Sequence, residues 1–309
     1  MEKVLVTGGA GFIGSNVVEL LLQEGWDVNV LDNLSTGNQR LIPQSANLII
    51  GDIRDKETVR QAAKNCSVIF HLAAFITVAD SLQKISECVG INILGTTNVI
   101  DIAAKEGVKR IVFSSSSAVY ADTAACPSPE TALCKPQSVY GQTKLSGEEF
   151  MRLASEGYGI ETVCLRYFNV YGPGQSVAGS YPSVIPSFIS RALKKEPLRI
   201  FGDGNQTRDF IFVKDVAAAN LKAATANLST NKANIWNIGC GIPTKIIELA
   251  NSINTLCGQS ANSITLEPPL QGDIYESCAD IQLSQKQIPW TPTISLQNGL
   301  QLTRNGWMI

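Results

Sequence analysis

An α/β fold, in which a doubly wound parallel sheet is followed by a smaller mixed region, is what this sequence predicts. Short apolar strands alternate with amphipathic helices through the first half of the 309 residues, as in a parallel sheet covered on both faces. A glycine-rich turn joins the first expected strand to the first expected helix. After residue 166 the pattern changes, and Gly, Pro and Ser crowd 172–186. We therefore expect a domain at 1–167 and a second region at 168–309 that interleaves with it.

Capping residues mark several of the expected helices. Asp55 is a helix N-cap, because its short carboxylate can accept from free backbone amides, and Gly25 and Gly107 follow helix ends. The expected strands are Lys3–Thr7, Asp27–Leu31, Asn47–Gly51, Val68–His71, Arg110–Ser114 and Thr162–Arg166. The expected helices are Phe12–Gln23, Asp55–Lys64, Ser81–Lys105 and Val139–Ser155. Shorter helices and strands follow at Ser187–Lys195, Leu198–Phe201, Asp215–Ala226, Ile235–Ile238 and Pro243–Leu256.

Composition excludes several classes of function. Hydrophobic residues make up 44% and charged residues 17%, so the chain can bury a core and is not disordered. The net charge is −2 without a basic run, which argues against a nucleic-acid partner. No apolar run reaches the ~18 residues of a membrane span, and the N-terminus reads as a strand rather than a signal peptide. We therefore expect a cytoplasmic protein with no membrane partner.

Cysteine and histidine usage narrows the chemistry. The eight cysteines show no C-x-x-C and no paired spacing, so we expect free and mostly buried thiols. His71 is the only histidine, which excludes Ser-His-Asp and Cys-His catalysis and a histidine-rich metal site. No metal is expected.

The first motif is a glycine-rich turn directly after the strand Lys3–Thr7. Gly8, Gly11 and Gly14 let the backbone turn tightly and approach a pyrophosphate, which would lie at the N-terminus of the following helix. This is the signature of a dinucleotide-binding Rossmann domain. Alone the triplet is weak evidence, because ordinary strand-to-helix turns also use glycine.

Two aspartates at strand ends add to this motif. Asp32 ends the second strand, 18 residues after Gly14, where a carboxylate can accept from the ribose hydroxyls of adenosine. It would repel a 2′-phosphate, and no arginine directly follows it, so NAD is favoured over NADP. Asp52, after the third strand, could lie by the adenine amino group. Either aspartate could instead be a turn or capping residue.

The second motif is a tyrosine with a lysine one helical turn later, Tyr140 and Lys144, on one face of an expected helix. A free phenol has a pKa of about 10, and a nearby ammonium and a cationic nicotinamide ring would favour its phenolate form. Ser116, within the run Ser114–Ser117, could hydrogen-bond the same substrate oxygen. The Y-x-x-x-K spacing also occurs by chance in surface helices. Together with the glycine motif, it predicts hydride chemistry on a carbinol.

In this order, the motifs resemble the extended short-chain dehydrogenase/reductase family, and within it the NAD-dependent sugar-nucleotide epimerases and dehydratases. The resemblance spans nearly the whole chain. It is carried by Thr7–Gly14, Asp32–Gly37, His71–Ala74, Ser114–Tyr120, Tyr140–Lys144, Arg166–Pro173 and Gly202–Phe210. It implies an enzyme in which NAD stays tightly bound and is regenerated in each catalytic cycle.

The resemblance also implies roles for single residues. The catalytic residues would be Ser116, Tyr140 and Lys144, while His71 would be structural or next to the cofactor and not a base. NAD would be bound by Gly8, Gly11, Phe12, Ile13, Gly14, Asp32, Asn33, Ser35, Thr36, Gly37, Asp52, Ile53, Leu72, Ala73, Ala74, Asn92, Ser114, Tyr140, Lys144 and Tyr167. The sugar nucleotide would be bound by Ser116, Asn169, Ser183, Val184, Phe201, Arg208, Asp273 and Ser277.

Relatives share the first oxidation and differ in the fate of the keto sugar. Dehydratases of the 4,6 type place Asp-Glu directly after the serine position, and sugar decarboxylases of the family carry Glu at the position of Ala118. This chain has Ser117-Ala118 there. The resemblance therefore implies 4-epimerisation of a UDP-hexose or UDP-N-acetylhexosamine through a transient 4-keto sugar, with Tyr140 as acid and base. A dehydratase or 4-reductase of the family, and a non-catalytic dinucleotide-binding protein, are the alternatives.

Small residues at two positions bear on the sugar. Family epimerases that exclude N-acetylated sugars have a tyrosine where this chain has Ser277, and Ser183 matches the subgroup that accepts them. We expect UDP-GlcNAc and UDP-GalNAc to be turned over at least as well as UDP-Glc and UDP-Gal. The chain departs from relatives at three positions, Leu270, Ile76 and Ala121. The helices expected at Ser81–Lys105 and Val139–Ser155 form a four-helix bundle between subunits in relatives, which implies a homodimer.

Overall fold

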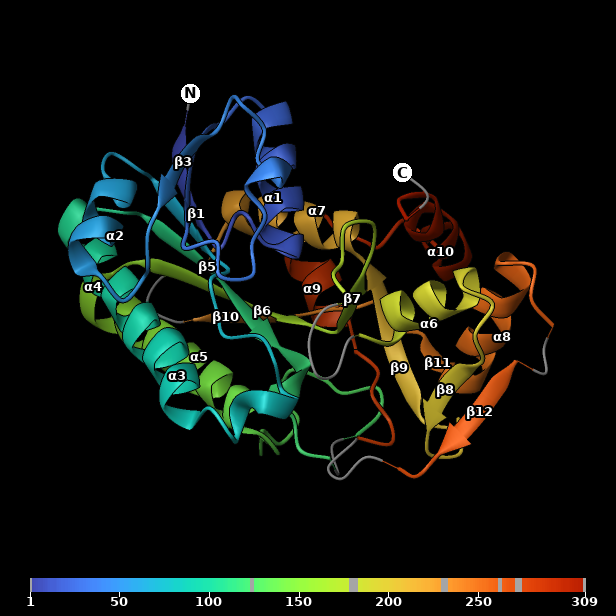
Figure 1. Ribbon diagram of the computed structural model, residues 1–309. Coiled ribbons are helices and arrows are strands. Elements are labelled where there is room, and N and C mark those ends of the chain that lie inside the picture. The colour runs from blue at the N-terminus through green and yellow to red at the C-terminus, as the bar shows by residue number, and fades with distance from the viewer. Residues whose placement is uncertain are drawn as a thin grey trace.

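A computed structural model describes residues 2–122, 125–177, 183–228, 233–260, 263–269 and 274–307. Its main feature is a seven-stranded sheet with strand order β10-β6-β5-β4-β1-β2-β3, in which every neighbouring pair is parallel (Figure 1). The strands are β1 (Lys3–Thr7), β2 (Asp27–Asp32), β3 (Asn47–Ile50), β4 (Val68–His71), β5 (Arg110–Ser116), β6 (Glu161–Tyr167) and β10 (Asn234–Ile238). The predicted doubly wound parallel sheet is confirmed.

Helices cover both faces of this sheet, because its central strands bury side chains on both sides. Val4 and Val6 of β1 pack into a core with α1 and α7, whereas Leu5 packs into a second core with α2, α4 and α5. These helices are α1 (Phe12–Gln23), α2 (Lys56–Ala63), α4 (Thr96–Glu106), α5 (Val139–Tyr158) and α7 (Val213–Thr225). Strands β2 and β3 lie on one side of β1, and β4, β5 and β6 lie on the other, so the order of the strands reverses between β1 and β4. Ligands of such sheets bind beyond the carboxyl ends of the strands at this point.

The prediction of one continuous helix at Ser81–Lys105 is wrong. Short 3₁₀ helix η2 (Ala79–Ser81) is followed by α3 (Ile85–Val89), a π-helical segment η3 (Gly90–Gly95) and α4. Lys84 before α3 has φ −118° and ψ 43°, outside the helical region. Asn92 lies in the π segment with its side chain buried. The side-chain amide binds the backbone of Phe75 and the hydroxyl of Thr143. Helical periodicity does not contain these long-range contacts.

Other boundaries moved by a few residues for local reasons. β5 continues past the expected Ser114 to Ser116, because β6 pairs with the serine run up to Tyr167. Helix α6 (Val184–Leu193) begins before the expected Ser187, since Pro186 lies in its first turn, where a missing backbone amide costs little. Asp55 caps α2 through the amide of Glu57, as expected.

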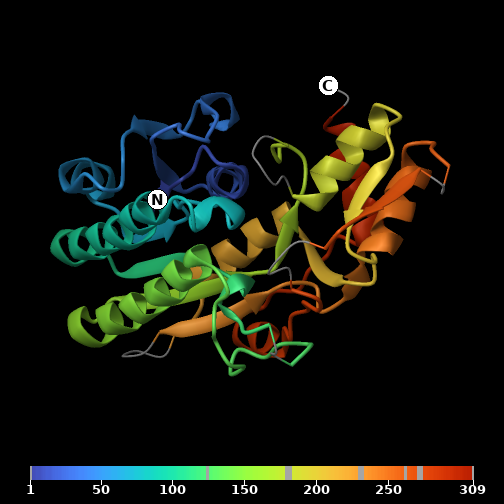
Figure 2. The ribbon, with the colours of Figure 1, turned by 60° about the horizontal axis from the view of Figure 1, so that its bottom comes forward.

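The second half of the chain contributes to both lobes. Strand β10 pairs with β6 in the main sheet, and α7 packs against α1. Helix α9 (Gln282–Gln287) also lies against β10. The other elements form a smaller lobe beside the sheet (Figures 1 and 2), namely β7 (Asn169–Tyr171), α6, β8 (Leu198–Phe201), β9 (Thr207–Phe212), β11 (Pro243–Lys245), α8 (Ile246–Leu256), β12 (Ile264–Glu267) and α10 (Leu296–Asn305). The stretch expected at Pro243–Leu256 is thus a short strand and a helix.

The cysteines are free thiols, as expected, and Cys126 is the exposed one among them. Within the described ranges, no helix has the length and apolar character needed to cross a membrane.

Candidate active site

The glycine turn between β1 and α1 packs against the loop that follows β4. Gly8 has φ +71°, and a Cβ there would lie 2.6 Å from the backbone nitrogen of Ala73. A Cβ on Gly14 would overlap the carbonyl oxygen of Gly8. The turn is therefore built from bare backbone, with Phe12 and Ile13 opening the helix behind it. Such a helix N-terminus favours an anion through its free amides and its dipole.

Asp32 joins this turn to the loop after β2. Its nearly buried carboxylate accepts from the amide of Ala10 at 2.9 Å and from that of Leu34 at 2.8 Å. Gly37 passes so close that a Cβ on it would lie 2.8 Å from the Asp32 oxygen. The turn-residue role considered for Asp32 is thus present in the structure. The carboxylate nevertheless lies beside the glycine turn, where a dinucleotide ribose would be bound.

Asp52 and Asn33 meet beyond the carboxyl ends of β3 and β2, at the same edge of the sheet as the glycine turn. Asn33 donates to Asp52 at 3.0 Å, and its Oδ1 accepts from the amide of Ser35. Arg54 binds both oxygens of Asp52, at 2.9 and 2.7 Å, and these hydrogen bonds lower the pKa of the carboxyl to about 2. Asp52 is thus a permanent anion with a partner. Its contact with adenine stays a prediction.

Ser116, Tyr140 and Lys144 come together from two elements. Ser116 ends β5 and its hydroxyl accepts from the amide of Ala118, while Tyr140 and Lys144 lie in the first turns of α5. The Ser116 hydroxyl lies beside the Tyr140 phenol, where it favours the ionised form. The Lys144 ammonium donates to the carbonyl of Ser114 at 2.7 Å and lies 5.8 Å from the centre of the Tyr140 ring.

The electrostatics of this group differ from the expectation. Burial raises the pKa of Tyr140 to about 12, and the Ser116 hydroxyl opposes that rise only in part. Burial also lowers the pKa of Lys144 to about 8, because a charged amine is disfavoured there. The polypeptide by itself therefore does not supply the lowered phenol pKa that a base needs.

Asn92 links the loop at Phe75 to helix α5, which carries Tyr140 and Lys144. Its side chain accepts from the amide of Phe75 at 2.7 Å and donates to Thr143 at 2.9 Å. Thr143 directly precedes Lys144, so these contacts connect the Phe75 segment to the helix that carries Lys144. That Asn92 orders an active site stays a prediction.

A profile of the NAD dependent epimerase/dehydratase family matches residues 4–239. The chain belongs to this family. A Methanocaldococcus jannaschii protein, provisionally named UDP-glucose 4-epimerase, is 41% identical over 99% of this chain and 98% of its own length. The structure of Thermotoga maritima UDP-glucose 4-epimerase with UDP-glucose superposes with a TM-score of 0.95 at 35% identity, covering 99% and 98% of the two chains. Methanobrevibacter ruminantium UDP-N-acetylglucosamine 4-epimerase, in complex with UDP-N-acetylmuramic acid, gives 0.93 at 32% identity with the same coverage.

The cofactor of this epimerase/dehydratase is NAD, and the described residues fit it. A Cβ on Gly8 or Gly14 would overlap backbone atoms of the packed turn, so the glycines keep the compact strand-to-helix turn on which a pyrophosphate is bound, and no arginine directly follows Asp32 in the sequence to hold a 2′-phosphate. The other residues expected to contact NAD follow β2, β3 and β4 or lie near the end of β5, at the same edge of the sheet: Ser35, Thr36, Ile53, Leu72, Ala74 and Ser114. Ile53 is buried in the core beneath this edge.

Tyr167 and His71 are buried behind the cofactor edge. The Tyr167 hydroxyl donates to Asn220 of α7 at 2.9 Å, and burial raises its pKa. The His71 ring lies between Thr7 at 2.7 Å and Thr96 at 2.9 Å, and burial lowers its pKa to about 3. A neutral ring held by two hydroxyls agrees with the structural role expected for His71.

Apart from Ser116 on β5, the expected substrate residues that the structure describes lie in the smaller lobe or the segments that join it. Asn169 on β7 is paired with Phe210 of β9, the strand that carries Arg208. Phe201 ends β8 partly exposed, and Ser183 and Val184 begin α6. Ser277 lies half-buried in the segment after Tyr275, whose hydroxyl donates to Asp203. Asp273 and Leu270 lie outside the described residues. These substrate contacts stay predictions.

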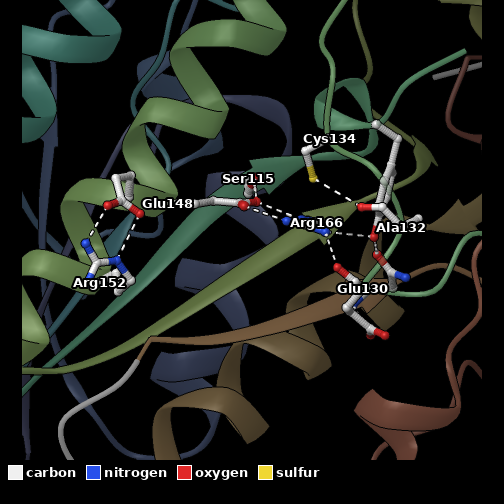
Figure 3. A network of polar contacts seen from close by, with 10 residues as sticks. Ser115, Glu130, Ala132, Cys134, Glu148, Arg152 and Arg166 are labelled. Carbon is white, nitrogen blue, oxygen red and sulfur yellow. Dashed lines mark hydrogen bonds and ion pairs between the residues drawn. The ribbon is translucent and has the colours of Figure 1, made fainter. Parts of the chain in front are cut away.

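Sequence reasoning missed a buried polar group behind Ser116, the serine expected to be catalytic. Glu148 on α5 lies between Ser115 of β5 and Arg166 of β6 (Figure 3). Two features of the sequence could have indicated it. Glu148 follows Lys144 by one helical turn and shares the inward face of the helix with Lys144 and Tyr140. Arg166 is a charged residue directly after the apolar residues Val163–Leu165 of its strand.

Proposed function

We propose that this enzyme inverts the C4 configuration of a UDP-hexose or UDP-N-acetylhexosamine through a transient 4-keto sugar. The observation that carries the proposal is the triad of Ser116, Tyr140 and Lys144, assembled beside the cofactor edge, with Ser117 and Ala118 on the next turn of the chain. The epimerase names of similar proteins, including two that act on UDP-sugars in solved complexes, support the same substrate class.

In the proposed reaction, Tyr140 takes the proton from the sugar O4 while the hydrogen on C4 leaves with its electron pair. Bound NAD would supply the hydride acceptor and donor for C4, and the positive charge of its oxidised ring would favour the phenolate form of Tyr140. The keto sugar presents its other face before C4 regains the hydride, and Tyr140 then returns the proton to O4. Ser116 holds O4 in line with the phenol, and no net oxidation results.

Lys144 contributes charge and position in this scheme. Lowering the phenol pKa from about 12 to near 7 requires about 7 kcal/mol of differential stabilisation. The ammonium beside the ring supplies part of it, because a positive charge favours phenolate. An ammonium has three donors, so the bond to Ser114 leaves two for the cofactor.

The turn after Ser116 favours epimerisation over the other outcomes. Eliminating water from C5 and C6 needs a second acid and base, and Ala118 instead uses its backbone amide to hold Ser116. The side chains of Ser117 and Ala118 carry no carboxylate. The keto sugar therefore has the return of hydride as its open route.

A panel of sugar nucleotides tests the proposal. Purified protein with NAD is incubated separately with UDP-Glc, UDP-Gal, UDP-GlcNAc and UDP-GalNAc, and products are resolved by their stereochemistry. We expect each productive substrate to equilibrate with its 4-epimer without accumulation of NADH. A 6-deoxy-4-keto product would indicate a dehydratase, and stoichiometric consumption of reduced cofactor a 4-reductase. A bound nicotinamide with no turnover of any sugar would indicate a non-catalytic binding protein.

Ser277 is proposed to leave room for an N-acetyl group. We expect Ser277→Tyr to lower turnover of UDP-GlcNAc by on the order of 10- to 100-fold, because a large ring would fill the space of the C2 substituent. Turnover of UDP-Glc should stay within a few-fold. The matched control is Ser277→Ala, which should retain both activities. Unchanged UDP-GlcNAc activity in the tyrosine variant would refute the gate.

A homodimer formed through a four-helix bundle is part of the proposal. Helices α4 and α5 lie side by side on the surface of the larger lobe (Figure 2). Leu153 and Tyr158 of α5 are exposed there, at 49% and 62%, beside a hollow that residues of both helices line. Exposed apolar side chains beside such a hollow suit the isologous packing of a second copy.

A further inference from the structure

The charged pair behind the catalytic serine is almost fully buried. Arg166 and Glu148 are each 3% exposed, and the guanidinium binds the carboxylate through two bonds of 2.8 and 2.7 Å. Burying two charges is costly even when they are well paired, so such a pair is weak evidence for stability. An apolar pair of similar volume could fill the same space. The pair therefore calls for a role other than holding the core together.

Both ends of the catalytic turn are attached to this pair. Ser115, on the opposite face of β5 from Ser116, donates to Glu148 at 2.5 Å. Tyr120, which directly follows the turn Ser117–Val119, accepts from Arg166 at 3.0 Å and donates to Asn237 of β10 at 2.6 Å. Figure 3 shows Glu148 reaching from α5 to both Ser115 and Arg166.

The catalytic helix also touches the turn directly. A Cβ on Gly141, the residue after Tyr140, would overlap the carbonyl oxygen of Ala118. The start of α5 therefore packs against Ala118, in the middle of the segment Ser117–Val119. Farther along the same helix, Glu148 binds Ser115, just before that segment. The distance between the Ser116 hydroxyl and the Tyr140 phenol is thus set by contacts on either side of it.

We propose that the Glu148–Arg166 pair is a positioning device, which fixes the Ser116 turn against the helix that carries Tyr140 and Lys144. Ser115 and Tyr120 are the two attachment points, and none of these four side chains needs to touch the substrate. The device rests on the proposed function, because it positions the groups that carry out that chemistry.

The network also reaches the segment that contains Ser277. Asn237 donates to the carbonyls of Ser128 and Asp280 at 2.8 and 3.0 Å. The amide of Ala279 in turn binds the buried carboxylate of Asp209, next to Arg208. The turn that bears the catalytic serine and the strand that bears an expected substrate residue therefore share one continuous set of polar contacts.

Removing one hydroxyl tests the proposal. In the holoenzyme, Ser115→Ala should lower kcat by on the order of 100-fold, because a shift of about 1 Å in a catalytic group has that effect. KM for the sugar nucleotide should stay within about two-fold, since the variant alters no expected substrate contact. Tyr120→Phe, which detaches the other end of the turn, should show the same pattern to a smaller degree.

A second measurement needs no substrate. The ionisation of Tyr140 is followed in the binary complex with NAD by its ultraviolet phenolate signal, taken as the difference from Tyr140→Phe. Ser115→Ala should move this titration to higher pH, because the Ser116 hydroxyl favours the phenolate. The other titratable groups that face Tyr140 are Lys144 on its own helix, Cys88 of α3 and Tyr167 of β6. None of them is changed in the variant.

The matched control is Thr162→Val. Thr162 donates to the carbonyl of Met151 at 3.1 Å, so its buried hydroxyl joins the same helix α5 to β6 at a distance from the turn. It should leave kcat and the Tyr140 titration unchanged. Equal effects of Thr162→Val and Ser115→Ala, or an unchanged titration in Ser115→Ala, would overturn the proposal. If the wild type turns over no sugar nucleotide, the proposed function fails, and the titration still decides the positioning role.

Discussion

Replacing Tyr140 with phenylalanine is expected to reduce turnover by about 10²- to 10⁴-fold, the contribution of a positioned acid and base. The ring stays in place, and the glycine turn and Asp32 that surround the cofactor edge are untouched. NAD should therefore stay bound in the variant, with only the expected contact of the Tyr140 hydroxyl lost. The measurement is kcat for the best sugar nucleotide of the panel, together with the nicotinamide content of the purified variant.

Tyr158→Phe is the matched control, because it removes a phenol hydroxyl from an exposed position at the end of the same helix. Turnover in this variant should equal that of the wild type. Full activity in Tyr140→Phe would mean that another group moves the proton, and the proposed mechanism would be wrong.

Replacing Lys144 with methionine is expected to lower turnover without lowering stability. At 5.8 Å from the Tyr140 ring, with an effective dielectric constant of about 20, one charge is worth about 3 kcal/mol, or on the order of 100-fold in rate. Loss of the bond to Ser114 adds to this through the position of the helix. The measurement is kcat at pH 7, with Lys105→Met, on the exposed side of α4, as the active control.

The free energy of unfolding should depend on pH in the opposite way to that of a protein in which a lysine gains an ion-pair partner, because the pKa of such a lysine rises on folding. The pKa of Lys144 falls from 10.5 to about 8 on folding, so the folded chain binds fewer protons between these values. Its contribution to stability is fully present above pH 10.5 and is lost as pH falls through 8. The cost below pH 8 is about 3 kcal/mol, against about 1–3 kcal/mol for the lost bond to Ser114.

Lys144→Met should therefore have an unfolding free energy at pH 7 that equals or exceeds that of the wild type. As pH rises from 8 to 10.5, the wild type should gain about 3 kcal/mol of unfolding free energy relative to Lys144→Met, so that the wild type becomes the more stable protein. Urea unfolding without added NAD, at both ends of this range, measures it. A large loss of stability at pH 7 would show that the lysine is kept for folding rather than for chemistry.

The first half of the fold could be read from the chain because its signals are local. The strand Lys3–Thr7, the helix Phe12–Gln23 and the strand Val68–His71 have the predicted boundaries. Each is an apolar run or an amphipathic period between turn residues, and such patterns involve only near neighbours in sequence. Asp55 capped its helix for the same reason.

Where distant segments compete with local preference, sequence reasoning went wrong. The serines of β5 read as the end of a strand, yet β6 supplies partners for all of them. Helical periodicity ran unbroken through Ser81–Lys105, but contacts of Asn92 with Phe75 and Thr143 accompany a π segment there. The strand at Ile235–Ile238 was expected, but not its pairing with β6 in the main sheet.

The amino-acid sequence by itself determined which reactive groups this protein has: a bare glycine turn, a tyrosine one helical turn from a lysine, a serine run and a single histidine. Only the tertiary structure decided how they are held and how they titrate. Ser115 and Glu148 are separated by 33 positions, and Tyr120 and Asn237 by 117. Burial by such distant segments raises the pKa of Tyr140 and lowers that of Lys144, because desolvation depends on the packed surroundings rather than on neighbours in the chain.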